Sequence, residues 1–276
     1  MADRAAKDAL FAEFAAVGKA LGSPKRLELL DLLAQGSRSV DDLARAAGLG
    51  LSTCSAHLQV LRESGLVVSR RDGKRVRYAL AGDDVAALWQ ALRGVAAAHR
   101  PSVDAAGDAY LGAADDAAVG VDELLAAVQT GDAVLLDVRP EVEYAAGHLP
   151  GALGIPLEQL ADRLAELPAD REVLVYCRGR YCALAHDALR LLAARGRPAR
   201  RSRDGLLEWR VAGRPLETSG PGCSGRAASA VSSTATWSAA VFDPALPAAR
   251  PEPPRRRSRG GRGTPATGGT RTSSSA

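Results

Sequence analysis

Two cysteines separated by four residues lie in a short segment that could carry sulfur chemistry. The segment runs Cys177-Arg178-Gly179-Arg180-Tyr181-Cys182, directly after the apolar run 173–176 and before a helical pattern over 182–195. A cysteine between a buried strand and a helix lies where backbone amides and the helix dipole converge, and their field favours the nucleophilic thiolate. Arg178 and Arg180 add positive charge that suits an anionic sulfur donor. The pattern predicts a nucleophilic Cys177, unless the two cysteines lie at the strand end by chance.

A second set of residues has the pattern of a DNA-reading element. Two short helices joined by a tight turn at 48–50 precede a hairpin, and the second helix of such a winged helix-turn-helix enters the major groove. Side chains on that helix that can hydrogen-bond to bases or phosphates are Ser52, Thr53, Ser55, His57 and Gln59. The hairpin carries five cations that fit phosphate or minor-groove contact, namely Arg70, Arg71, Lys74, Arg75 and Arg77. The alternative for the hairpin is a merely solvated charged turn.

The first hundred residues supply the elements that would position this reader. Apolar residues at helical spacing predict helices over 8–21, 24–36, 39–48, 52–65 and 83–99. Ser23, Ser39 and Asp83 are predicted as helix N-caps, and Pro24 fits a first turn. Strands 66–71 and 75–80 are predicted as a hairpin because the Asp72-Gly73 pair between them is a strong turn signal.

The elements that would position Cys177 alternate between strand and helix. We predict a helix over 122–129, a strand over 133–138, a strand or turn near 152–155, a helix over 157–166, a strand over 172–176, a helix over 182–195 and a helical turn over 205–212. Such alternation predicts a mostly parallel sheet covered on both faces. Residues 101–120 are rich in Ala, Gly and Asp and are interpreted as a linker, or as an extension of the preceding helix beyond a break at Pro101.

Charge and composition fit two parts with different partners. Residues 1–100 hold 15 Lys and Arg against 11 Asp and Glu, residues 101–220 hold 13 against 19, and residues 221–276 hold 8 against 2. The chain shows neither a membrane-spanning apolar run nor a secretion signal, and its 4 cysteines argue against a disulfide scaffold, so a cytoplasmic location is expected. Residues 218–276 lack periodicity and are predicted to be disordered.

The DNA-reading part resembles the ArsR family of small dimeric repressors. The resemblance is carried by GKALGSPKRL at 18–27, LSTCSAHLQVLRESGLV at 51–67 and the basic wing. It implies a homodimer held by the first and last helices, whose apolar faces include Leu88, Trp89 and Leu92. Many relatives bind metal through a Cys-x-Cys pair at the third helix, but residues 38–42 here contain no thiolate, so metal sensing at that place is rejected. His57 and His99 are isolated, and Cys54 is interpreted as a core residue rather than a thiol switch.

The second part looks like a rhodanese domain over about 121–217. The resemblance is carried by LDVRP at 136–140, Glu143-Tyr144, GHLPGA at 147–152, Ile155-Pro156, the Cys177 loop and DGLLEW at 204–209. It implies that Cys177 takes a sulfane sulfur, becomes a persulfide and passes the sulfur to a thiol or cyanide, with loop residues Arg178, Gly179, Arg180, Tyr181 and Cys182 cradling the persulfide. Asp137, Arg139 and His148 are interpreted as scaffold and Trp209 as core. Arg180 is bulky where a compact residue would give a tighter turn, and Cys182 is either a resolving thiol or the first residue of the helix.

The sequence therefore predicts a two-domain chain: a mainly α winged helix-turn-helix over 8–100, a linker over 101–120, an α/β rhodanese-like domain over 121–217 and a tail over 218–276. The predicted function is that of a DNA-binding transcriptional repressor. Its rhodanese-like domain is predicted to form a cysteine persulfide and to sense or transfer sulfane sulfur. One alternative is a sulfurtransferase that the winged helix dimerises or tethers, and another is a non-catalytic interaction module. Double-stranded DNA, a second copy of the chain, a sulfane-sulfur donor and a thiol acceptor are the expected partners, with no cofactor, metal or membrane.

Overall fold

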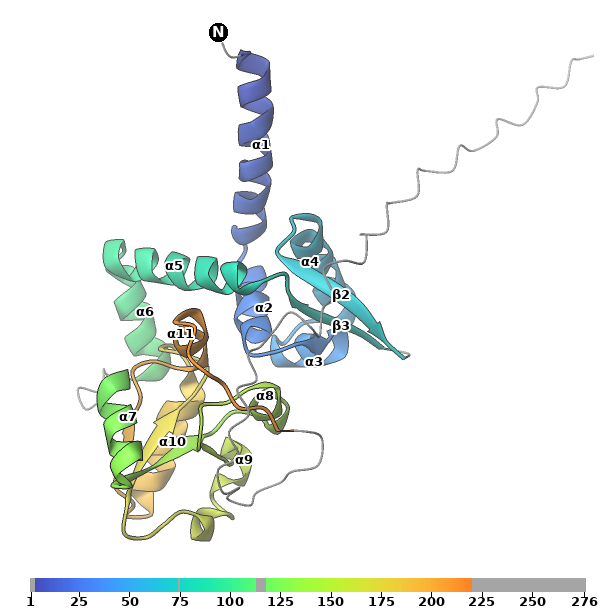
Figure 1. Ribbon diagram of the computed structural model, residues 1–276. Coiled ribbons are helices and arrows are strands. Elements are labelled where there is room, and N and C mark those ends of the chain that lie inside the picture. The colour runs from blue at the N-terminus through green and yellow to red at the C-terminus, as the bar shows by residue number, and fades with distance from the viewer. Residues whose placement is uncertain (1–2, 74, 113–117, 220–276) are drawn as a thin grey trace, which may run out of the picture. The chain divides into compact units, whose positions relative to one another are not determined.

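The computed structural model describes residues 3–73, 75–112 and 118–219 (Figure 1). Lys74 of the predicted wing lies outside these ranges, as do Cys223, the fourth cysteine, and the predicted disordered tail from residue 220 onward. Within the described ranges, no helix is both long enough and apolar enough to cross a membrane.

The N-terminal part is a winged helix. Its elements are α1 (Arg4–Leu21), α2 (Pro24–Ala34), β1 (Arg38–Ser39), α3 (Val40–Ala46), α4 (Leu51–Glu63), β2 (Val67–Asp72), β3 (Arg75–Leu80) and α5 (Asp83–His99). The predicted hairpin is confirmed: β2 and β3 pair antiparallel with Asp72 opposite Arg75, and Gly73 takes a positive φ of 59° in the turn. The short β1, which the sequence did not predict, adds to this hairpin and gives a sheet of order β1-β3-β2.

Helix N-caps lie at two of the three predicted positions, Ser23 and Ser39. The Ser39 hydroxyl accepts a hydrogen bond from the Asp42 amide at 3.2 Å, as an N-cap should. Ser23 stands at the N-cap position of α2 without a capping bond from its side chain. The prediction for Asp83 is wrong by one residue, because Gly82 is the N-cap of α5 and Asp83 lies in the first turn, where its charge suits the helix dipole.

The C-terminal part is an α/β domain, as predicted. It comprises α6 (Ser102–Leu111), α7 (Val121–Thr130), β4 (Ala133–Asp137), α8 (Glu141–Ala146), β5 (Leu153–Gly154), α9 (Leu157–Leu160), η1 (Leu164–Glu166), β6 (Glu172–Tyr176), α10 (Ala183–Ala194), β7 (Ala199–Arg201) and α11 (Leu206–Val211). The sheet has the order β5-β4-β6-β7, and every described pairing in it is parallel. The sequence missed α8 and β7, and the helix expected over 157–166 is two short pieces. The segment after Pro101 is a helix rather than a loop, in agreement with the second interpretation above.

Alternation along β6 separates two apolar cores, one on each face of the sheet. Val173, Val175 and Cys177 point to the core formed with α9 and α10, while Leu174 and Tyr176 point to the core formed with α7 and α11. Cys177 therefore follows a strand that is buried on both faces, as the unbroken apolar run predicted.

One helix of the C-terminal domain also belongs to the winged-helix core. Leu207 of α11 is fully buried and belongs to the same apolar cluster as residues of α2, α4 and α5, and Val211 packs against that cluster. The contact continues through polar groups, because the Arg210 guanidinium donates to Asp83 at 2.8 Å and to the Ala34 carbonyl at 3.0 Å. Helix α11 thus joins the two domains directly.

Candidate functional site

Cys177 lies at the end of β6 in a loop that leads into α10. Its side chain is 3% exposed, and Cys182 occupies the N-cap position of α10. The Cys182 amide donates to the Gly179 carbonyl at 3.1 Å, which closes a tight turn. The first amides of α11 donate to the loop in turn, Leu206 to the Cys177 carbonyl at 3.0 Å and Leu207 to the Arg178 carbonyl at 3.2 Å. The loop is therefore fixed at both ends and against α11.

Gly205 is required by this packing. A Cβ atom at position 205 would lie 2.3 Å from the Gly179 nitrogen and 2.4 Å from the Cys177 carbonyl oxygen, closer than real Cβ atoms approach backbone. Only glycine lets the start of α11 come this near to the loop. The glycine of the quoted 204–209 motif therefore shapes the Cys177 loop from outside it.

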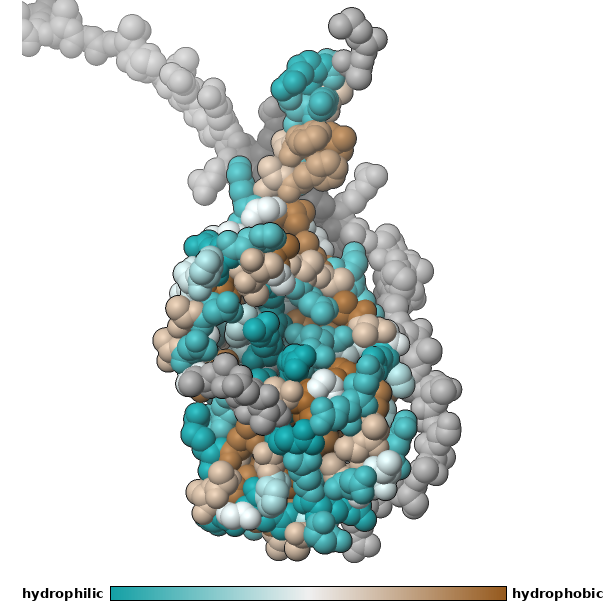
Figure 2. Space-filling model, turned by 90° about the vertical axis from the view of Figure 1, so that its left-hand side faces the viewer, coloured by the Kyte–Doolittle hydropathy of each residue, from teal (hydrophilic) through white to brown (hydrophobic). Residues whose placement is uncertain are grey.

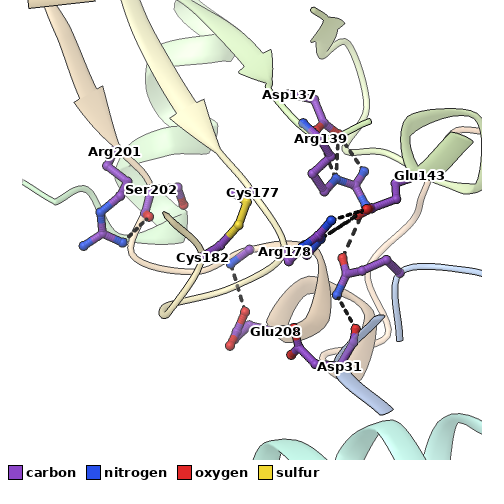
Figure 3. The surroundings of a disulfide bond; sticks show 12 residues. Asp31, Asp137, Arg139, Glu143, Cys177, Arg178, Cys182, Arg201, Ser202 and Glu208 are labelled. Atoms are coloured by element: carbon purple, nitrogen blue, oxygen red, sulfur yellow. Dashed lines mark hydrogen bonds and ion pairs between the residues drawn. A yellow bond between two sulfur atoms is a disulfide. The ribbon is translucent and has the colours of Figure 1, made fainter. Parts of the chain in front are cut away.

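Cys177 and Cys182 are joined by a disulfide bond (Figure 3). Their Cα atoms are 6.2 Å apart, within the usual range for a disulfide. The two ends of the loop can therefore bond without rearrangement of β6 or α10. The sequence alone does not give this Cα separation, and the structure places the Cys182 sulfur within bonding distance of the Cys177 sulfur.

A buried carboxylate ties the loop to the winged helix. The Arg178 guanidinium donates to both carboxylate oxygens of Glu143, at 3.0 Å and 2.6 Å (Figure 3). Arg38 of β1 forms a second ion pair with the same carboxylate. The exposed side-chain fractions are 1% for Glu143, 7% for Arg38 and 22% for Arg178. Burial disfavours the charged guanidinium, but the hydrogen bonds and charge of Glu143 outweigh it and raise the pKa of Arg178. Arg178 thus holds Glu143, so its charge does not stand free for a sulfur anion.

The motif residues Asp137 and Arg139 form a buried pair behind the loop. The Arg139 guanidinium donates to the Asp137 carboxylate at 2.6 Å and to the Gly147 carbonyl at 2.7 Å, and the Tyr176 hydroxyl donates to Asp137 at 2.5 Å. Burial, followed by the charge of Asp137, raises the pKa of Tyr176 well above its ordinary value. Arg139 also donates to Gln35 of the winged helix at 3.4 Å. These bonds agree with the scaffold role expected for the two residues.

Arg93 of α5 approaches the loop from the winged helix. Its guanidinium lies 3.4 Å from Glu208 of α11 and 5.5 Å from the Tyr181 ring centroid. Glu208 in turn accepts a hydrogen bond from the Gly205 amide at 2.9 Å. Burial raises the pKa of Glu208 even though the charge of Arg93 opposes the shift. The surroundings of the loop are therefore built from both domains.

A cavity of about 330 Å³ lies beside the second half of the loop. Arg180 and Tyr181 of the loop line it together with residues of α6, of the segment between α6 and α7, of α10, and of the end of β7 and the segment after it, namely Asp104, Gly107, Asp108, Leu111, Gly112, Ala118, His186, Arg201 and Arg203. Arg180 is exposed, which explains how a bulky side chain is accommodated at the third loop position. The cavity wall thus carries the side chains of Arg180, Arg201 and Arg203 together with the carboxylates of Asp104 and Asp108.

The predicted DNA-reading residues lie on two elements of the winged helix. Ser52, Thr53 and Ser55 are exposed on α4, whereas His57 and Gln59 are half-buried and the Gln59 amide donates to Glu63 at 2.6 Å. On the wing, Arg70, Arg71 and Arg75 are exposed. Arg77 differs, because its guanidinium donates to the Ser37 carbonyl at 2.5 Å. Cys54 is fully buried in the core, as interpreted, and burial raises the pKa of its thiol.

Comparison with known proteins agrees with this division. Residues 23–69 match the bacterial regulatory protein arsR family model, and residues 120–212 match the rhodanese-like domain model. The HTH-type transcriptional regulator Rv0324 of Mycobacterium tuberculosis is 49% identical over 215 residues, which are 78% of this chain and 95% of that protein. The chain belongs to the ArsR family of transcriptional regulators and carries a rhodanese-like domain.

Relatives of each domain of this ArsR-family regulator are also known separately. A sulfurtransferase of Allochromatium vinosum is 33% identical over 87 residues, which are 32% of this chain and 80% of that protein. The homodimeric winged helix-turn-helix DNA-binding domain of Mb0332 from Mycobacterium bovis, solved by NMR, is 48% identical and covers 37% of this chain and 93% of its own, with a TM-score of 0.35.

Several residues around the Cys177 loop could not be predicted from the sequence. The rhodanese resemblance includes Glu143 without giving it a role, and no sequence pattern points to Arg38, Arg93 or Glu208. The two partners of Glu143, Arg178 and Arg38, lie 35 and 105 residues away from it in the sequence. No local spacing rule could therefore have paired them with it. A charged residue at a position where burial is expected is the one signal that was available for Glu143.

Proposed function

We propose that this protein is a homodimeric, cytoplasmic DNA-binding repressor whose DNA affinity is set by the sulfur state of Cys177. The carrying observation is the shared carboxylate of Glu143, which pairs with Arg178 of the loop 177–182, here called the sulfur loop, and with Arg38 of the β1-β3-β2 sheet. A persulfide lengthens the Cys177 side chain by one sulfur atom and moves its negative charge outward within the loop to which Arg178 belongs, where it would compete with Glu143 for Arg178. Loss of the Arg178–Glu143 ion pair would therefore also disturb the Arg38–Glu143 ion pair, and with it strand β1 beside the wing.

The route from Arg38 to the wing is short. Arg38 pairs with Tyr78 and Ser39 pairs with Arg77 across the β1–β3 ladder. The Arg77 guanidinium also donates to Ser37, directly before β1. Because the wing strands continue this ladder, displacement of β1 alters the presentation of Arg71 and Arg75. The two covalent states of Cys177 provide the discrete states that such coupling needs.

A homodimer is supported by apolar surface on the first and last helices of the winged helix. Leu10, Phe11 and Phe14 of α1 are 54–60% exposed, and the helix at the top of Figure 2 shows the corresponding brown surface. Leu88 and Val95 of α5 are also exposed. Such surface marks an interaction site, and the relative Mb0332 domain is described as homodimeric. Trp89 and Leu92 were predicted to belong to the same dimer surface as Leu88, but they are less exposed. The Trp89 indole donates to Asp31 of its own chain at 2.9 Å, and Leu92 is half-buried.

The sulfur donor is proposed to be a small anion carrying a sulfane sulfur, such as thiosulfate or a persulfide of a low-molecular-weight thiol. The support is the cavity beside the loop, with Arg180, Arg201 and Arg203 in its wall. Loop residues 178–182 are proposed to hold the persulfide through their backbone. Transfer onward to a thiol, in the manner of a sulfurtransferase, is the second candidate activity, and the similarity to the sulfurtransferase of Allochromatium vinosum favours it.

The test is DNA binding in two sulfur states. Fluorescence anisotropy with DNA from the promoter of its own operon gives Kd for the reduced protein and for protein treated with glutathione persulfide. We expect the two values to differ about five-fold or more, as allosteric coupling of at least 1 kcal/mol requires. Cys177→Ser should bind DNA equally under both treatments.

Arg178→Lys keeps the charge but not the two-point contact with Glu143, so the ratio of the two Kd values should fall toward unity. Arg190→Lys, at an exposed pair with Asp187 on α10, is the matched control and should retain the full response. Equal Kd values for the two states of the wild-type protein would contradict the regulatory function. If the wild-type protein nevertheless transferred sulfur to a thiol, the alternative function as a sulfurtransferase enzyme would be favoured.

A further inference from the structure

The disulfide in the loop connects the cysteine proposed to carry sulfur with a second cysteine that the fold holds beside it. Cys177 belongs to the core between the sheet and α10, and Cys182 packs against that same core. The turn closed by the Cys182 amide and the Gly179 carbonyl fixes the backbone of Cys182. Direct bonding of the two sulfurs means that the Cys182 sulfur can reach the sulfur atom attached to Cβ of Cys177.

We propose that Cys182 discharges the Cys177 persulfide with release of hydrogen sulfide. This inference rests on the proposed function, since it requires that Cys177 first accepts a sulfane sulfur. The Cys182 thiolate attacks the inner sulfur of the persulfide, the inner–outer sulfur bond breaks, and the outer sulfur leaves as hydrosulfide. The product is the Cys177–Cys182 disulfide that the structure contains.

Atoms and electrons balance without a further oxidant. With thiosulfate, the Cys177 thiolate takes the sulfane sulfur and sulfite leaves. In the second step the Cys182 thiol gives up its proton to become the attacking thiolate, and the departing sulfur ends with one proton as hydrosulfide. The two electrons that reduce the sulfane sulfur to sulfide come from the two cysteines, which end as a disulfide. The sulfane-sulfur donor is thus itself the oxidant.

The position of Cys182 suits this attack. It is the N-cap residue of the 12-residue helix α10, where unpaired amides and the helix dipole favour a thiolate. Cys54, the remaining cysteine among the described residues, is fully buried in the winged-helix core and burial raises the pKa of its thiol. Among the residues that the structure describes, Cys182 is therefore the thiol available to Cys177.

The choice of sulfur atom decides the outcome for the whole protein. An external thiol that attacks the outer sulfur takes it away and restores the Cys177 thiolate, which is sulfur transfer. Cys182, attacking the inner sulfur, ends the cycle in a disulfide that persists until a thiol reductant opens it. Cys177 is 3% exposed in the closed loop, so the disulfide state is shielded. Cys182 thus converts a brief exposure to sulfane sulfur into a lasting state of the loop.

The experiment uses the full chain, reduced, desalted and kept free of oxygen, with thiosulfate and glutathione persulfide as alternative donors and no added thiol. Intact mass, peptide mapping and a sulfide assay follow one addition of donor. Wild-type protein should lose two hydrogens, form the Cys177–Cys182 disulfide and release about one sulfide per chain, as the two-step exchange requires. Cys182→Ser should instead keep one added sulfur on Cys177 and release at least ten-fold less sulfide. Cys54→Ser is the matched control and should behave as the wild type.

The outcomes separate this inference from the proposed function. If Cys182→Ser and the wild type both keep the added sulfur on Cys177 without sulfide release, the discharge is overturned while persulfide formation stands. Transfer of the sulfur to Cys182 with no disulfide also overturns it. If neither protein gains sulfur at Cys177 from either donor, the proposed function and this inference both fail. Circular dichroism of Cys182→Ser confirms that the variant is folded.

Discussion

Glu143→Gln removes the charge that two arginines share and leaves the size of the side chain unchanged. Removing one partner of a buried ion pair costs about 3–5 kcal/mol, because the remaining charge is left uncompensated in a poorly solvated site. The Arg178 side chain is 22% exposed and can turn to water, whereas Arg38 is 7% exposed and is stranded. We therefore expect the lower end of the range, about 3 kcal/mol, which corresponds to a fall in Tm of about 6–12 °C for a protein of this size.

Urea denaturation of the reduced protein, followed by tryptophan fluorescence, measures this loss. Glu166→Gln is the matched control, because Glu166 forms a single ion pair with Arg163 at the surface and its loss should cost about 1 kcal/mol or less. Arg38→Met in the Glu143→Gln background removes the stranded cation and should recover about 1 kcal/mol or more. A Glu143→Gln variant within about 1 kcal/mol of the wild type would refute the reasoning about the shared carboxylate.

Three further variants test the wing, the loop and the pH dependence. Arg71→Ala with Arg75→Ala should weaken binding to every DNA sequence and reduce the slope of log K against log salt by about 1–2, whereas an unchanged slope would remove the wing from the interface. Gly205→Ala should cost about 1–3 kcal/mol in urea and block sulfur uptake, because its Cβ meets backbone, while Gly120→Ala, with open space around its Cβ and an ordinary φ, should do neither. Burial lowers the pKa of His148 in the folded protein below its ordinary value of 6.5. As pH falls below 6.5, the unfolded chain therefore takes up the His148 proton more readily than the folded protein, and the free energy of unfolding should fall. His148→Gln should flatten that dependence in urea titrations across pH, and an unchanged slope would contradict it.

Patterns among residues close together in the sequence determined much of the fold. The β2–β3 hairpin follows from Asp72-Gly73 between two strand-like runs, and the N-cap at Ser39 follows from a serine at the start of a helical pattern with Asp41 and Asp42 in its first turn. The buried strand 172–176 and the helix after Cys182 placed the candidate nucleophile correctly at a strand end. These features depend on residues within a few positions of one another, so periodicity and turn chemistry are enough to predict them. The short strands β1 and β7 were missed because two or three residues carry no readable period.

Tertiary structure alone decided how the sulfur loop is connected. The Glu143 carboxylate unites Arg38 and Arg178 although Arg38 lies 105 residues away in the sequence, and Leu207 of α11 is buried in the core of the other domain. The direct bond between Cys177 and Cys182 likewise depends on a turn whose Cα separation no spacing rule supplies. An ion pair or a core contact forms wherever folding brings two groups out of water together, and neither the identity of a charged residue nor its immediate neighbours specifies the distant partner.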